Sequence, residues 1–87
     1  MNYWPKKRAS EKLDYRIDWS ARLDWDQIAS SQWTVPAGLT ATNQSFTTTA
    51  TTIWLSGGTA GKRYSLTCKI TTIQGRIIEE TVGLEVH

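Results

Sequence analysis

Apolar and polar residues alternate one by one along most of this 87-residue chain, and this period of two limits the folds open to it. Between Asp14 and Leu23 every second residue is apolar, and the three- and four-residue spacing of a helix does not persist. Successive side chains of an extended strand point to opposite faces, so the pattern is typical of a strand with one buried face. The sequence therefore predicts an all-β fold without a helix.

The same pattern recurs in short segments that are separated by turn residues. Proline and glycine end strands and permit tight bends at Pro36–Gly38, Ser56–Gly61 and Gln74–Arg76. The expected strands are residues 14–23, 28–35, 39–46, 47–55, 64–72 and the segment after Arg76. Six to seven short strands with frequent turns favour an immunoglobulin-like antiparallel β-sandwich, with a six-stranded barrel as the alternative.

The alternation also predicts which side chains form the core. The inward positions are Tyr15, Ile17, Trp19, Ala21, Leu23, Ala29, Ser31, Trp33, Val35, Thr51, Ile53, Leu55, Tyr64, Leu66, Cys68, Ile70, Ile78, Val82, Leu84 and Val86. Glu80 falls on the inward side of the last strand, which predicts a bulge or a sheet edge there. Tyr64 stands where β-sandwiches place a tyrosine corner, whose hydroxyl bonds to the upstream backbone.

Length and composition indicate one small domain with a charged N-terminal arm. The hydrophobic fraction of 39% and charged fraction of 21% do not fit a disordered chain. Residues 1–12 contain Pro5 and several charges but no alternation, so we expect a flexible arm ahead of a single sandwich domain at residues 13–87. The start of the chain lacks a signal-peptide pattern, and no apolar run could span a membrane. We therefore expect synthesis in the cytoplasm and no membrane partner.

Few residues are suited to catalysis or to holding a cofactor. Cys68 is the single cysteine and His87 the single histidine, which argues against a disulfide, a multi-cysteine metal site and histidine-dependent catalysis. Gly57–Lys62 has the wrong spacing for a phosphate loop. Asp24 and Asp26 could bind calcium, although a solvated turn is the simpler interpretation, and this alternative stays open. We expect no enzyme activity and no cofactor.

Tryptophans outside the predicted core are the strongest sign of an interface. Three of the five tryptophans, Trp4, Trp25 and Trp54, do not fall on inward positions, and exposed indoles anchor protein interfaces. The arm adds aromatic and cationic side chains, so the candidate interface residues are Tyr3, Trp4, Lys6, Lys7, Arg8, Trp25 and Trp54. Trp54 covering the open end of the sandwich is an equal alternative. A net charge of +2 does not indicate nucleic-acid binding.

Several stretches of the chain are similar to small structural proteins of bacteriophages and prophages. They are Leu13–Ser20 (LDYRIDWS), Ile28–Leu39 (IASSQWTVPAGL), Thr52–Gly61 (TIWLSGGTAG) and Tyr64–Arg76. The chain resembles, over about Leu13 to Val86, the short immunoglobulin-like proteins known as phage fibre–tail adaptors. It departs from them at Lys7–Ser10, at Asp24 and Trp25, and at Cys68.

The resemblance implies a non-enzymatic virion protein. Such a protein would act as an adaptor at the tail or neck and dock on other tail, neck or fibre proteins. A homo-oligomer in the assembled particle is compatible with this role. A glycan-binding β-sandwich module, with Trp25 and Trp54 as platforms for sugar rings, is the alternative function.

Overall fold

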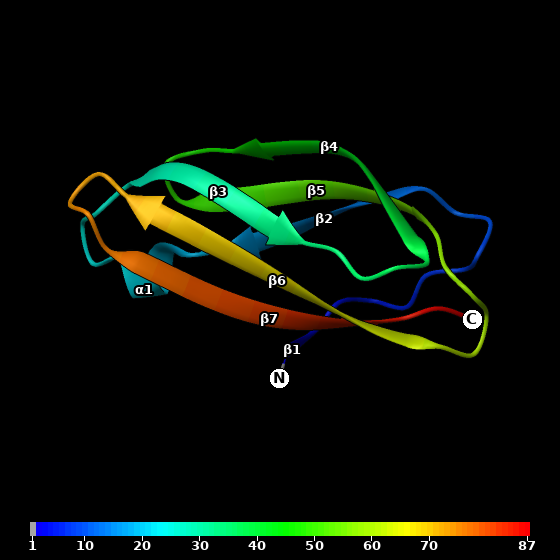
Figure 1. The fold of residues 1–87 in the computed structure, drawn as a ribbon. Coiled ribbons are helices and arrows are strands. Elements are labelled where there is room, and N and C mark those ends of the chain that lie inside the picture. The colour runs from blue at the N-terminus through cyan, green and yellow to red at the C-terminus, as the bar shows by residue number, and fades with distance from the viewer. Residues whose placement is uncertain (1) are drawn as a thin grey trace.

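Alternating buried and exposed side chains build two β-sheets that pack face to face in the computed structural model, which describes residues 2–87 (Figure 1). The elements are β1 (Asn2–Tyr3), β2 (Leu13–Asp18), α1 (Ser20–Leu23), β3 (Ile28–Thr34), β4 (Leu39–Phe46), β5 (Ala50–Gly57), β6 (Arg63–Thr72) and β7 (Ile77–Glu85). One sheet has the strand order β1-β7-β6-β3 and the other β2-β5-β4. All neighbouring strands are antiparallel except β1 and β7. The prediction of an all-β sandwich is confirmed.

The chain crosses between the two sheets four times, from β1 to β2, from β2 to β3, from β3 to β4 and from β5 to β6. The predicted tyrosine corner is also present, because the Tyr64 hydroxyl accepts a 2.9 Å hydrogen bond from the backbone N–H of Thr59. Hydrogen bonds with the Thr59 side chain and with its backbone lower the pKa of Tyr64, and they tie the start of β6 to the preceding turn.

The predicted core is confirmed along β2, β5, β6 and β7. On β5, Thr51, Ile53 and Leu55 are fully buried, whereas Trp54 between them faces outward. Trp19 is buried just after β2, and its indole Nε1 donates a 2.9 Å hydrogen bond to Thr51 Oγ1. Cys68 lies in the same core, where burial raises the pKa of its thiol to about 11. The residues that face inward from both sheets therefore form one core cluster.

The first strand is shorter than predicted, because its second half forms a helical turn. Strand β2 ends at Asp18, and its carboxylate Oδ1 accepts a 3.0 Å hydrogen bond from the N–H of Ser20 as α1 begins. Ala21, predicted to face inward, is consequently exposed on α1, while Leu23 still reaches the core. The expectation of a chain without a helix is thus wrong by one turn. This turn is far too short to cross a membrane, and residues 2–87 contain no other helix.

Two further local predictions are wrong, one in β3 and one at the start of β5. A bulge between Ile28 and Ser30 shifts the alternation of β3, so Ile28 is buried and Ala29 is exposed. At Glu80 the sheet-edge alternative is confirmed and the bulge is not, because β1 pairs with β7 only at Val82 and Gly83 while β7 keeps its register with β6. The Glu80 carboxylate forms a 2.6 Å ion pair with Arg22 at this edge. The strand predicted from Thr47 begins at Ala50 instead, after a turn.

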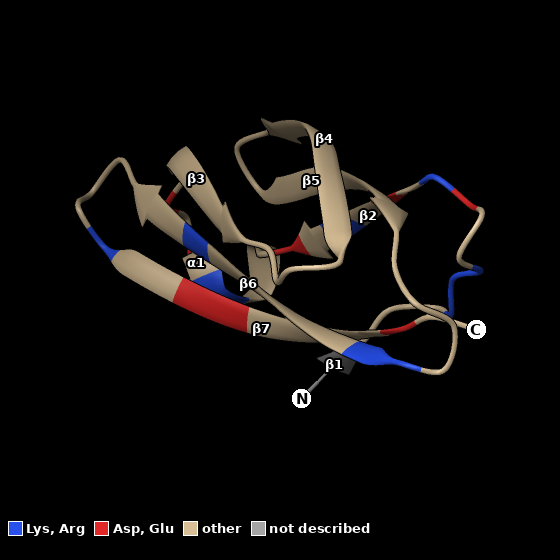
Figure 2. Cartoon of the chain, turned by 45° about the vertical axis from the view of Figure 1, so that its right-hand side comes forward, with Lys and Arg blue, Asp and Glu red and all other residues tan. Residues whose placement is uncertain are grey.

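Charged residues are unevenly distributed over the sandwich. The segment from Gln27 to Gly61, which holds β3, β4 and β5, contains no Asp, Glu, Lys, Arg or His. Figure 2 shows these three strands without red or blue, whereas red occurs on β7 and both colours occur around the N-terminal segment. One side of the molecule is therefore polar without being charged.

Candidate docking site

Three turns meet at the end of the sandwich that carries α1 (Figure 1). The β6–β7 turn binds the α1–β3 turn through a 2.9 Å hydrogen bond from Ile73 N to Gln27 O. The β4–β5 turn joins them, since Ile28 N donates to Thr48 O at 3.0 Å. Backbone hydrogen bonds thus hold the three turns together as one surface.

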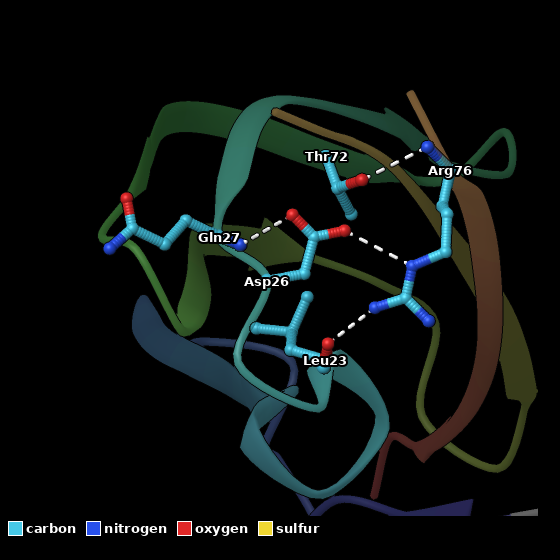
Figure 3. Close-up of polar contacts among 5 residues, drawn as sticks. All are labelled: Leu23, Asp26, Gln27, Thr72 and Arg76. Atoms are coloured by element: carbon cyan, nitrogen blue, oxygen red, sulfur yellow. Dashed lines mark hydrogen bonds and ion pairs between the residues drawn. The ribbon is translucent and has the colours of Figure 1, made fainter. Parts of the chain in front are cut away.

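A buried carboxylate fastens two of these turns, as Figure 3 shows. Asp26 is 4% exposed, and its Oδ2 accepts a 3.1 Å hydrogen bond from Arg76 Nε while its Oδ1 accepts one of 2.8 Å from Gln27 N. The Arg76 guanidinium also donates a hydrogen bond to Leu23 O, and the backbone N–H of Arg76 donates one of 2.9 Å to Thr72 Oγ1. The Asp26–Arg76 pair therefore ties the α1–β3 turn to the β6–β7 turn.

These donors decide the ionisation of Asp26. Burial by itself raises the pKa of this carboxyl, but hydrogen bonds from the Thr72 hydroxyl, the Gln27 amide and the Arg76 guanidinium outweigh it, so the pKa lies below its ordinary value. Residues 2–87 hold no group of three or more His, Cys, Asp or Glu that could bind a metal ion. The structure thus gives the calcium interpretation of Asp24 and Asp26 no support.

Large apolar side chains project into solvent from the same three turns. Trp25 is 97% exposed, Ile77 66%, Ile73 62% and Phe46 44%, and we call these four residues the loop-end patch. They make up four of the six large apolar side chains exposed on the described part of the chain. Isolated exposed apolar residues are ordinary, but several on one hydrogen-bonded surface mark an interaction site.

Trp25 is held outward by an unusual backbone. Asp24 and Trp25 have φ of +47° and +71°, and they are the only non-glycine residues in the range 2–87 with positive φ. This left-handed conformation costs an L-residue about 1–2 kcal/mol, although aspartate tolerates it better. Strain of this kind is concentrated at functional sites. The predicted role of Trp25 at an interface thereby gains a structural argument.

Three members of the loop-end patch were not predicted from the sequence. Ile73 and Ile77 flank the β6–β7 turn, both out of phase with the inward positions of their strands, and this phase is a signal that the sequence does contain. Phe46 ends β4 opposite Thr51, so its side chain points to the inner face of the sheet. Its exposure could not be read from alternation.

The predicted arm lies along the sandwich instead of extending from it. Strand β1 pairs with Val82 and Gly83 of β7, and Lys7 N donates to Glu85 O at 3.0 Å. The Lys7 side chain is fully buried, and its Nζ donates to Gly57 O at 2.7 Å and to Arg8 O at 2.8 Å. Lys7 therefore fastens the arm and is not exposed to a partner.

The other arm residues are placed in different ways. The Trp4 ring stacks on Tyr15 with 4.7 Å between centroids, and its Nε1 donates to Arg16 O at 3.3 Å. Lys6 Nζ lies 3.6 Å from the Glu85 carboxylate, and Arg8 is exposed.

Tyr3 is 60% exposed and lies flat on Gly83 of β7. A Cβ at Gly83 would overlap the Tyr3 ring, so glycine is required at this close approach.

Trp54 lies apart from the loop-end patch. It is 38% exposed on the outer face of β5, opposite Asp14, so it does not cover the open end of the sandwich. Trp54 lies four residues along β5 from Ala50, which pairs with Asp18 just before α1, and four residues of a strand span about 13 Å. Trp25 and Trp54 are therefore both exposed but lie on separate parts of the surface.

A hollow of about 290 Å³ opens between β2 and β7. It is lined by Trp4, Arg16, Ile17, Asp18, Trp19, Arg22, Glu80 and Val82. The Arg22 guanidinium and the Glu80 carboxylate of this lining bind each other, and the lining includes no serine, threonine, cysteine, lysine or histidine. This arrangement does not resemble an acid, base and nucleophile gathered around a substrate.

Comparison with known proteins gives a family match over nearly the whole chain. A family model described as "Podophage GP4 fiber-tail adaptor protein gp77" matches residues 7–85. Comparison with curated proteins finds no match. The matched range includes Lys7 and all four residues of the loop-end patch.

Proposed function

This chain belongs to the podophage fibre–tail adaptor family, and from that premise we propose that it is a non-enzymatic virion protein that docks on other tail, neck or fibre proteins through its loop-end patch. The observation that carries the proposal is Trp25, an indole 97% exposed on a strained backbone in one of three joined turns. Such a side chain adds almost nothing to the packing of its own domain. It is suited to fill a pocket on a partner.

The surroundings of Trp25 favour tight docking. Interface energy is usually concentrated in a few aromatic or large apolar side chains that become desolvated together, and Ile73, Ile77 and Phe46 supply such neighbours. The Asp26–Arg76 pair fixes the turn that carries the indole. A surface that is already ordered loses less conformational entropy when it binds.

The test is binding of the purified chain to each tail, neck and fibre protein encoded beside it, measured by calorimetry. The double variant Ile73→Ser/Ile77→Ser should weaken binding at least about tenfold, because it removes two apolar contacts. Trp54→Ser, on the outer face of β5, is the matched control and should bind as the unchanged chain does. Circular dichroism confirms that both variants fold. Equal affinity of the double variant and the unchanged chain would refute the proposed site.

A further inference from the structure

Strands β3 and β4 are the free edges of the two sheets on one side of the sandwich, and both are uncharged. Figure 1 shows them along the same side of the molecule. Exposed edge strands are usually protected from pairing by charged side chains, above all lysine, or by proline. Strand β3, Ile28–Thr34, contains neither, and beyond its bulge it runs regularly from Ser30 to Thr34.

The hydrogen-bonding groups at this edge follow from the register of the sheet. Gly83 O accepts from Trp4 N at 3.0 Å, so Gly83 turns its backbone groups away from β6. The alternation of antiparallel ladders then directs Gln32 toward β6 and leaves the N–H and C=O of Ser31 and Trp33 pointing out of the sheet. Within residues 2–87 these groups have no backbone partner. The free edge of β3 can therefore pair with a further strand.

The facing sheet has side chains that such a strand would cover. Gln44 and Phe46 of β4 stand opposite Ile53 and Thr51, whose side chains are fully buried, so all four point to the inner side of the sandwich. Gln44 and Phe46 are nevertheless exposed, Phe46 by 44%. The reason is that the first sheet ends at β3, and no strand lies beneath this part of β4.

We propose that an extended, uncharged segment of another virion protein adds as a strand to the free edge of β3 over Ser30–Thr34 and covers Gln44 and Phe46. This inference rests on the proposed adaptor function and names a second surface for it, which shares only Phe46 with the loop-end patch. Main-chain hydrogen bonds to Ser31 and Trp33 would supply affinity, and alternate side chains of the segment would contact Phe46. The segment is uncharged because no charged residue lines the site to pair with a buried charge.

A second copy of this chain does not fit the same place. Strand β4 extends past the edge of β3, as the exposure of Gln44 and Phe46 on its inner face indicates. Pairing β3 with the β3 of a copy around a two-fold axis would bring both projecting β4 strands into the same space. A single strand from a different protein avoids this clash.

The test uses overlapping peptides that span the tail, neck and fibre proteins encoded beside this chain. A peptide that binds should protect the Ser31 and Trp33 amides from hydrogen exchange. Gln44→Lys, which places a charge under the added strand, should weaken that binding at least about tenfold. Ser45→Lys is the matched control: its side chain lies on the opposite face at the next position, and binding should stay within about twofold.

A second variant removes only the hydrogen bond. Ser31→Pro deletes an outward N–H that β6 does not use, so the sandwich should stay folded while peptide binding is lost. Three results would overturn the inference. They are that no peptide binds, that a bound peptide leaves hydrogen exchange at Ser31 and Trp33 unchanged, or that the two lysine variants weaken binding equally. Protection of these amides that grows with the concentration of the chain alone would also overturn it, in favour of self-association.

The outcome is separable from that of the proposed function. The Ile73→Ser/Ile77→Ser variant should lose affinity for the intact partner of the loop-end patch and keep peptide binding at β3. If the double variant loses affinity for the intact partner but no peptide binds at β3, the docking proposal for the loop-end patch holds and the strand-addition proposal is refuted. If a peptide binds at β3 but the double variant keeps its affinity for the intact partner, strand addition holds and the docking proposal for the loop-end patch is refuted.

Discussion

Trp25→Gly should make the protein more stable and a poorer adaptor at the same time. At 97% exposure, only a small part of the indole surface is buried in the domain. With roughly 250 Å² for a tryptophan side chain and about 25 cal/mol per Å², the lost burial is worth only about 0.2 kcal/mol. Replacement therefore costs almost nothing in packing.

The change in backbone strain stabilises the variant, and its effect on the free energy of unfolding is larger than that of the lost burial. Trp25 has φ of +71°, and glycine removes the cost of about 1–2 kcal/mol that an L-residue has there. Glycine also makes the unfolded chain more flexible, which offsets about 0.4–1 kcal/mol of this gain. At the middle of these ranges the net increase is about 0.6 kcal/mol, or about 2–5 °C in the midpoint of thermal unfolding for a domain of this size. Trp25→Ala keeps the strain and should stay within about 0.5 kcal/mol of the unchanged chain.

Thermal unfolding and calorimetric binding together test this reasoning. Trp25→Gly should lose about 30-fold or more in affinity for the partner, as expected for a central aromatic anchor. Asp24→Gly is the control, because it relieves the neighbouring strained residue at φ +47° and keeps the indole. It should gain stability and bind normally. A clear loss of stability in Trp25→Gly or Trp25→Ala would mean that the indole packs on its own domain, and the argument would fail.

Three other predictions concern buried groups. Trp33→Ala should lower the free energy of unfolding, measured by chemical denaturation, by about 3–5 kcal/mol. Trp33→Phe should lower it distinctly less, because the buried Trp33 Nε1 has no hydrogen-bond partner within residues 2–87 that the substitution would remove. Equal losses for the two variants would contradict this. Asp26→Asn should be less stable than the unchanged chain at neutral pH. Since folding lowers the pKa of Asp26, that difference should be lost as the pH falls from about 4 through the folded-state pKa, and a difference constant with pH would refute it. Cys68, with a pKa of about 11, should react with a thiol reagent at pH 8 only as the protein unfolds, whereas fast labelling under native conditions would show access to the core.

The parts of the fold that could be predicted from the sequence depend on local periodicity. Alternation identifies Ile53 and Leu66 as core residues because each strand has one face toward the same interior. The tyrosine corner is predictable for a similar reason, since Tyr64 and the backbone that it binds are only five residues apart. These features need no knowledge of distant contacts.

The parts that could not be predicted depend on contacts between distant segments. Lys7 looks like a solvated cation, and its burial follows from a carbonyl fifty residues away, at Gly57. The exposure of Phe46 likewise depends on where the facing sheet ends. For the docking site, only Trp25 was found, because the meeting of the three turns is a property of the topology and not of any single segment.

The two flanks of this sandwich are not equivalent. Along Val82 and Gly83 the chain's own first residues complete the sheet, and the Trp4 indole caps a carbonyl of β2 beside them, while the opposite flank stays available. Continuous edge-to-edge polymerisation requires an unpaired edge strand on both sides of each molecule. An N-terminal segment that already occupies part of the β7 edge leaves a neighbouring copy fewer backbone groups to pair with there, and so lowers the tendency of this sandwich to form fibrils.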